Sequence, residues 1–242
     1  MKENNEENIQ SKPINQANAT NEDKNLQIGN IISKTEMFIE KNKKALIITI
    51  SAIVLLVVVF CLYKFWYMPS QEKNAENDMY AAEYYFMQND YAKALNGDGK
   101  HLGMIAIADD YSHTKHGNLA KYYAGIMYLK QNKFQDALNY FEDFKAKDAF
   151  LSSQKKSLTA DCYWSLNNVD KAISLYKDAA KINPNDFTTP PILMKLGIAY
   201  ESKKDYEAAL DCYNQIKHDF PRSPEFRDIE KYISRVETLT AK

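Results

Sequence analysis

Residues 125–141 read GIMYLKQNKFQDALNYF, and two later stretches repeat the same pattern at a nearly constant interval. Residues 160–176 read ADCYWSLNNVDKAISLY, and residues 197–213 read GIAYESKKDYEAALDCY. Each stretch begins with a small residue, has a tyrosine three positions later and an alanine twelve positions later, and ends on an aromatic residue. The intervals are 35 and 37 residues, which predicts a stacked repeat architecture.

The pattern has a packing explanation. A small residue on one helix and an alanine on the next let two helices approach closely, and the aromatic residues fill the space around that contact. Prolines follow two of the stretches, at Pro184 and Pro221, where they stop one helix or start the next. The domain resembles the tetratricopeptide repeat family, and three such repeats are expected over residues 118–222.

A weaker unit precedes these three. Ala82, Tyr85 and Ala94 match the small, tyrosine and alanine positions, but Asp98 stands where the others have an aromatic residue. Residues 70–117 are therefore expected to form a degenerate first repeat with an inserted helix over 101–111. Residues 223–242 are expected to form a polar-faced helix that caps the array. The expected fold is all-α: one transmembrane helix, then a solenoid of about four helix pairs and the cap.

The transmembrane prediction comes from residues 45–63, which read ALIITISAIVLLVVVFCLY without a charge. At about 1.5 Å per residue this run is roughly 28 Å long, close to the hydrocarbon thickness of a bilayer. The run is apolar all round, whereas a soluble helix would show a polar stripe. The stretch before it is 44 residues long, and Lys64-Phe65-Trp66-Tyr67 follows it instead of a small-residue cleavage site, so we expect an anchor that is not cleaved.

The lysines around the span predict its orientation. Lys34, Lys41, Lys43 and Lys44 precede it, and only Lys64 and Lys73 follow closely. By the positive-inside rule, the N-terminus is expected in the cytoplasm and the repeats on the far side. Residues 34–68 then form the juxtamembrane segment and the span. Residues 1–33, which are rich in Asn, Glu, Gln and Lys, are expected to be a disordered cytoplasmic tail.

The whole layout resembles a narrower family, the ancillary subunit of the bacterial Sec translocon. The resemblance rests on residues 38–44 (FIEKNKK) leading into the span, residues 91–97 (YAKALNG) and residues 108–120 (ADDYSHTKHGNLA). It implies a bacterial inner-membrane protein with a periplasmic repeat domain. It also implies two kinds of partner: Sec translocon subunits and a membrane-anchored periplasmic chaperone of the prolyl-isomerase type.

The first helices of the repeats are expected to line a groove that binds protein. Counting along the pattern gives a largely apolar and aromatic candidate set, which suits unfolded or nascent client proteins: Leu119, Tyr122, Ile126, Asp161, Trp164, Met194 and Ile198. The lysines and asparagines with which the carboxylate-clamp repeats grip a chain terminus are missing there. The alternative is that these side chains pack against neighbouring helices and leave no open groove.

Other classes of function find little support. The net charge of −1 offers no field for nucleic acid. The three cysteines form no zinc or redox motif, and Cys162 and Cys212 are expected to pack as small apolar residues. Gly97-Asp98-Gly99-Lys100 lacks the first glycine and the final Ser or Thr of a phosphate-binding loop, and we interpret it as a turn.

His113 and His116 have a spacing that can bind metal, but no further ligand pattern completes a site. No catalytic motif appears, so neither an enzyme nor a cofactor is expected. The sequence therefore predicts a membrane-anchored protein-binding module, and the resemblance implies an ancillary factor of the Sec translocon that contacts clients and other chaperones. The alternative is a structural scaffold with one fixed partner in another envelope assembly, such as outer-membrane biogenesis or division.

Overall fold

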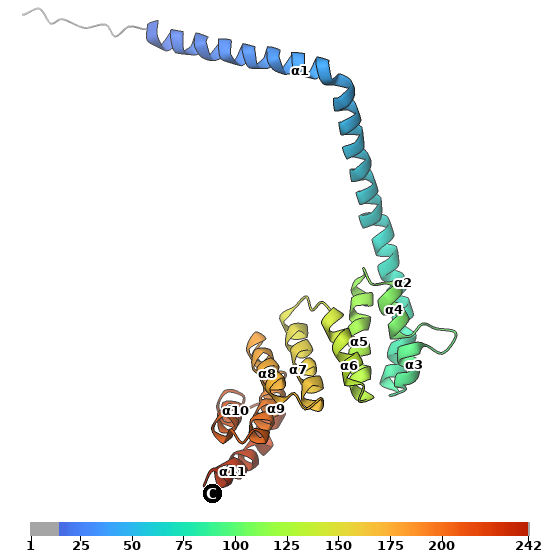
Figure 1. The fold of residues 1–242 in the computed structure, drawn as a ribbon, viewed down its shortest axis with the longest axis vertical. Coiled ribbons are helices and arrows are strands. Elements are labelled where there is room, and N and C mark those ends of the chain that lie inside the picture. Colours follow the sequence, from blue (N-terminus) through green and yellow to red (C-terminus); the bar gives the residue numbers. More distant parts are fainter. Residues whose placement is uncertain (1–14, 242) are drawn as a thin grey trace, which may run out of the picture. The chain divides into compact units, whose positions relative to one another are not determined.

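The computed structural model describes residues 15–241, with side chains from Glu36 onward. The chain divides into two compact units, one that ends at Trp66 and one that comprises Tyr67–Lys242. The described residues contain helices and no β-strand (Figure 1). The expected all-α class is therefore confirmed.

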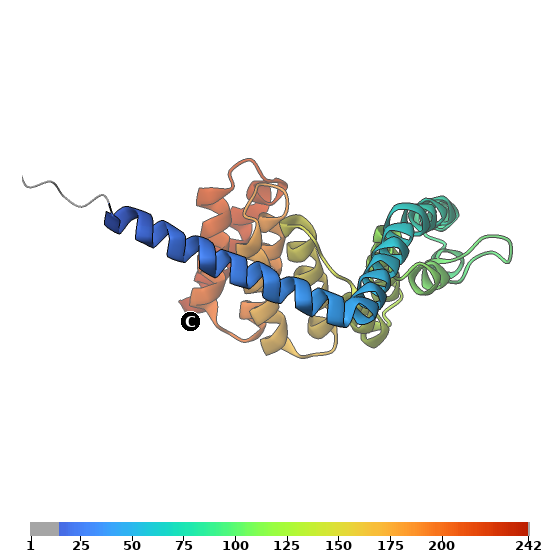
Figure 2. The same ribbon diagram turned by 90° about the horizontal axis from the view of Figure 1, so that it is seen from above.

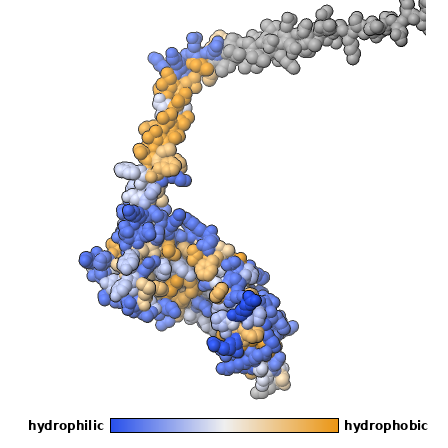
Figure 3. Space-filling model, turned by 180° about the vertical axis from the view of Figure 1, so that it is seen from behind, coloured by the Kyte–Doolittle hydropathy of each residue, from blue (hydrophilic) through white to orange (hydrophobic). Residues whose placement is uncertain are grey.

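The first unit is one long helix, α1 (Asn15–Leu62), followed by a π-helical turn, η1 (Tyr63–Tyr67). Its window of highest hydropathy averages 3.2 and none of that window is buried, so α1 is long and apolar enough to cross a membrane. Orange apolar residues run along it in Figure 3. The hydroxyl of Thr49 donates to the carbonyl of Ala45 at 2.9 Å, which satisfies a polar group within the apolar run.

The expected disordered tail, residues 1–33, is only partly described. Residues 1–14 lie outside the described part of the chain, and residues 15–33 belong to α1, where the sequence predicts disorder. A helix extends from an existing helix without the cost of a new nucleus, and residues 15–33 contain no proline.

The second unit stacks helices that follow one another in sequence, and consecutive helices pack together (Figures 1 and 2). Its elements are α2 (Met68–Met87), α3 (Tyr91–Asn96), α4 (Met104–Asp110), α5 (Lys115–Lys130), α6 (Phe134–Asp143), α7 (Ala149–Ser165), α8 (Val169–Ile182), α9 (Thr189–Ser202), α10 (Tyr206–Asp219), η2 (Pro224–Asp228) and α11 (Ile229–Thr240). The three strong repeats are the pairs α5–α6, α7–α8 and α9–α10.

The turns between paired helices share one backbone conformation. Asn89, Asn132, Asn167 and Lys204 all have a left-handed φ, between 58° and 61°. Asparagine tolerates this conformation better than most residues with a side chain. Asn89 lies between α2 and α3, so the degenerate first repeat has the same turn as the three strong repeats.

The small residues make the close contacts that the sequence predicts. A Cβ atom on Gly125 would lie 2.6 Å from the ring of Phe141, and one on Gly197 would lie 2.4 Å from the ring of Tyr213. Each glycine thus lies directly against the aromatic residue that ends its stretch. The repeat pattern reflects helix-to-helix contact within each pair.

The degenerate first repeat, formed by α2 and α3, has a polar contact where the strong repeats have an aromatic one. The Tyr85 hydroxyl donates to the Asp98 carboxylate at 2.8 Å, so the aspartate in the aromatic position binds the tyrosine of its own unit. The inserted helix is α4, which begins at Met104, three residues later than the sequence predicts. Met104 and Ile107 are fully buried, which makes α4 part of the core.

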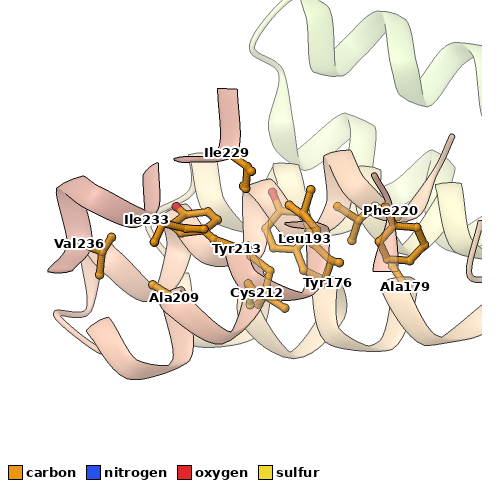
Figure 4. Close-up of a cluster of buried hydrophobic side chains, with 14 of the residues drawn as sticks. Tyr176, Ala179, Leu193, Ala209, Cys212, Tyr213, Phe220, Ile229, Ile233 and Val236 are labelled. Carbon is orange, nitrogen blue, oxygen red and sulfur yellow. The ribbon is translucent and has the colours of Figure 1, made fainter. Parts of the chain in front are cut away.

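The C-terminal end of the array is closed by η2 and α11. Ile229, Ile233 and Val236 are buried against α10, as their helical spacing predicts. Figure 4 shows them with Tyr213 in one apolar cluster, which also includes Tyr176 of α8 and Leu193 of α9. This cluster is the core that fixes the last two repeats and the cap.

Candidate protein-binding site

One pocket brings together three of the seven candidate groove residues. Asp161 and Trp164 of α7 and Ile198 of α9 line a pocket of about 330 Å³, together with Ser165, Tyr176 and Lys195. Ile198 is exposed and Trp164 is half-buried. The pocket therefore lies between the first helices of two consecutive repeats, where the sequence predicts the groove.

The other four candidates lie outside this pocket and, like Trp164, pack against core clusters. Tyr122 lies with its ring 5.1 Å from that of Phe144, and Ile126 packs on the same cluster as Tyr122. Leu119 packs on the cluster around α2, α4 and α5, and Met194 packs on the C-terminal cluster. All four are partly buried, so each has a smaller exposed fraction than Ile198.

Three of the residues that line the pocket form a polar triad. The Tyr176 hydroxyl donates to one oxygen of Asp161 at 2.6 Å, and the Lys195 ammonium donates to the other at 2.8 Å. Burial, with Asp161 nearby, raises the pKa of Tyr176 well above its usual range, so the phenol stays a proton donor. Asp161 thus joins α7, α8 and α9, and both of its oxygens are occupied.

The same triad recurs one repeat later. Glu201 accepts from the Tyr213 hydroxyl at 2.6 Å and from the Arg235 guanidinium at 2.5 Å. In both triads the acid and its cation are 34 residues apart, which is one repeat length. The cation of each following helix therefore ties it to the preceding repeat.

Sequence reasoning missed these triads. It placed Asp161 in the groove by position and did not connect it with Tyr176 or Lys195. The available signal was the tyrosine, in place of phenylalanine, at the end of the second and third stretches, because a buried tyrosine needs an acceptor for its hydroxyl. The first stretch ends on Phe141, which needs none.

The glycine-rich turn after α3 is closed by its own residues. Asp98 accepts from the backbone N–H groups of Lys100 and His101, and its other oxygen lies 2.9 Å from Nδ1 of His101. These hydrogen bonds, with that from Tyr85, hold the pKa of Asp98 well below its usual range. Asp98 thus holds the loop closed from within, in agreement with the interpretation as a turn.

The remaining candidates from the sequence are two histidines and two cysteines. His116 lies beside Glu72, with Nδ1 2.5 Å from the carboxylate, and His113 is exposed. Among the described residues no cluster of three or more His, Cys, Asp or Glu could hold a metal ion. Cys162 and Cys212 are free and buried, and burial raises the pKa of each thiol to about 12.

Two family models match this chain, and both are described as tetratricopeptide repeat. One covers residues 122–187 and the other covers residues 192–223. Together they span the three strong repeats. No curated protein matches the sequence.

A solved structure shows a similar fold at low identity. A crystal structure titled MamA protein aligns with a TM-score of 0.50 and 15% identity, covering 69% of this chain and 92% of its own. A second MamA structure aligns with a TM-score of 0.46 and 18% identity, covering 66% and 96%. At these identities the likeness concerns the fold alone. Residues 122–187 and 192–223 are thus tetratricopeptide repeats, an architecture that serves as a protein-interaction module.

Proposed function

We propose that this protein is a membrane-anchored protein-binding module whose pocket between α7 and α9 receives an apolar side chain of the bound protein. The observation that carries the proposal is the pocket itself, in which the indole of Trp164 and the exposed Ile198 flank an opening of about 330 Å³. Aromatic residues in such positions supply much of the affinity of protein interfaces.

The triad in the pocket lining supports this use. Because Asp161 is already bound by Tyr176 and Lys195, its carboxylate is paired and does not oppose an apolar guest. The guest would gain chiefly from burial against Trp164 and Ile198. Apolar burial is tolerant of sequence, which suits a protein that meets many unfolded or nascent chains.

We further propose that α1 anchors the repeats in the bacterial inner membrane, with the N-terminus in the cytoplasm and the repeats in the periplasm. The support is the uncharged run of residues 45–63 and the excess of lysines before it. The tether would raise the concentration of the pocket near emerging chains. The resemblance to the ancillary Sec subunit suggests the translocon and a membrane-anchored periplasmic chaperone as neighbours.

A photo-cross-linking amino acid at Ile198, in the full chain expressed in cells, tests the proposal. We expect adducts with translocon subunits or with secretory chains in transit. The same probe at Ser234, exposed on α11, is the control for non-specific contact. Equal adducts at both positions, or none at Ile198, would contradict a binding role for the pocket.

Trp164→Ala distinguishes the two kinds of binding role. If the protein is a holdase that binds many unfolded chains, we expect a moderate loss of many adducts. If it is a scaffold with one fixed partner in another envelope assembly, we expect the loss of one dominant adduct. Leu166→Ala is the matched control, because Leu166 is exposed at the end of the same helix and lines no part of this pocket. An unchanged adduct pattern with Trp164→Ala would contradict the proposed role of the indole.

A further inference from the structure

The two ends of the repeat array differ in the surface that they expose. The last helix, α11, presents charged and polar residues outward: Glu230, Lys231, Ser234 and Glu237. The first helix, α2, exposes Tyr80, Tyr84 and Met87, with 76%, 51% and 69% of their surface accessible. Repeat arrays need polar outer faces at their ends, so the apolar stripe on α2 calls for a partner.

The stripe lies on the side of α2 that the core does not use. Ala75, Met79 and Ala82 face the core and are buried. At about 100° per residue, Tyr80, Tyr84 and Met87 lie roughly 140° away around the helix. The helix therefore has two apolar faces, and the described residues of the second unit cover only one of them.

We propose that this second face is where two copies of the chain pair, with their α2 helices parallel. Asn77, Tyr80, Tyr84 and Met87 are spaced by three, four and three residues, which is the a–d–a–d spacing of a two-stranded parallel coiled coil. In this register Asn77 takes an a position, where a single polar asparagine favours dimers and fixes the alignment. The proposal rests on the membrane anchor proposed above.

The charges beside the stripe fit a parallel pair. Glu76 and Glu83 take the g positions, and they would meet Ala81 and Gln88 of the other copy at the e positions. No like charges meet there, and the stripe from Asn77 to Met87 is itself uncharged. Lys73 bounds it on the side of the span.

A second copy is the occupant that the chain favours over its own segments. The chain leads from the span through η1 directly into α2, so no helix pair stands between the span and α2 to cover the stripe. With a membrane-crossing α1, the N-terminal tail would lie on the other side of the bilayer. Two copies in one membrane both present the stripe at the same distance along the chain from the span, which suits a two-fold pair.

The stripe is short, so pairing depends on the shared membrane, which raises the effective concentration of one copy near another. The test therefore uses the purified full chain in liposomes, with Cys61→Ser to remove the exposed native thiol. Met87→Cys reports the stripe and leaves Asn77, Tyr80 and Tyr84 in place. Asn139→Cys, exposed on α6, is the control for random collision.

Under mild oxidation we expect Met87→Cys to give a disulfide-linked dimer in at least fivefold greater yield than Asn139→Cys. Adding Tyr80→Glu and Tyr84→Glu should lower the yield to that of the control. Both tyrosines are exposed, so these changes leave the core intact, and circular dichroism checks this. Equal yields for Met87→Cys and Asn139→Cys, or a yield that the two glutamates leave unchanged, would overturn the proposal.

Alkaline extraction of the same liposomes reports the anchor separately. A chain that is extracted yet cross-links at residue 87 refutes the anchor and shows that the two copies pair without a shared membrane. A chain that resists extraction and does not cross-link retains the anchor and refutes the interface. A different protein as the natural occupant would also leave the purified chain without a cross-link, and would refute the pairing.

Discussion

At the scale of the residue, this fold depends on a few close contacts that tolerate no added atom. Gly197 lies against Tyr213, whose hydroxyl in turn binds Glu201. Tyr213 thus combines a steric requirement, at its ring, with a polar one, at its hydroxyl. The equivalent contact of Gly125 with Phe141 has only the steric part.

Gly197→Ala tests the steric requirement. The new methyl group would meet the Tyr213 ring, and overpacking of this kind costs about 1–3 kcal/mol. Urea denaturation of the full chain in detergent should show the loss. Gln215→Ala, exposed on α10, should change stability by less than about 0.5 kcal/mol, and an equal loss in both variants would argue against the steric explanation.

Glu72 is a residue whose role depends on pH. Burial alone would raise the pKa of Glu72, but hydrogen bonds from the backbone of Lys115 and from His116 outweigh it and lower the pKa. The carboxylate accepts the N–H groups of Lys115 and His116 at 2.7 and 3.1 Å, at the start of α5. It therefore joins α2 to the N-terminus of α5.

Because the folded-state pKa of Glu72 is lowered, its contribution to stability is present above the unfolded pKa and is lost as the pH falls. We expect Glu72→Gln to be less stable than wild type at pH 7, and the difference to shrink as the pH falls below about 4.5. Thermal unfolding at several pH values measures it. Glu76→Gln, which changes an exposed residue of the same helix, should show no such trend, and a constant deficit for Glu72→Gln would contradict the ionic explanation.

At the scale of the element, the helix pairs share a common turn, and three of the four pairs also share a side-chain cap. The second helices α3, α8 and α10 are each capped by an Asp or Asn side chain, from Asp90, Asn168 and Asp205. Three of the four left-handed turn positions hold asparagine, and the fourth holds Lys204. This local chemistry favours the reversal of the chain within each pair.

Lys204→Gly tests the turn. Residues with a Cβ atom pay about 1–2 kcal/mol in the left-handed region, whereas glycine does not, so we expect a gain of about 0.5–1 kcal/mol. Lys203→Gly is the matched control, because Lys203 has an ordinary φ of −86° and glycine there should destabilise. Chemical denaturation distinguishes the two, and shifts of the same sign would contradict the conformational explanation.

At the scale of the whole repeat unit, stacking and end-capping decide stability. Each repeat touches mainly its neighbours, and the acid–cation contacts 34 residues apart tie one repeat to the next. The cap α11 closes one end by burying its apolar face against α10. Loss of the cap should therefore loosen the last repeat first.

Ile233→Ala tests the cap, since Ile233 is 5% exposed and lies in the C-terminal cluster. Truncation of a buried isoleucine costs about 2–5 kcal/mol. Relative to wild type, we expect hydrogen exchange in the variant to become faster in α10 and α11 and to change little in α5 and α6. Leu239→Ala, on the exposed side of the same helix, should have little effect. Uniformly faster exchange throughout the unit would contradict a local role for the cap.

The sequence by itself determined the helical class, the repeat period and the apolar helix long enough to span a membrane. These follow from the spacing of residues along the chain, because the same small and aromatic residues recur wherever two helices must pack closely. The residues of the cap, Ile229, Ile233 and Val236, were found in the same way, and their burial agrees with their spacing.

Only the tertiary structure decided which candidate groove residues line a pocket and which pack inward. Helical periodicity places Tyr122 and Trp164 on the same kind of face, but the neighbours of each are set by contacts between helices far apart in sequence: Phe144 stands beside Tyr122, while Trp164 borders an opening toward Ile198. For the same reason, the sequence pattern predicts neither the pairing of Asp161 with Lys195 nor the exposed face of α2. A one-dimensional pattern shows which side of a helix is apolar, and the packing of the other helices determines which of those sides remains open.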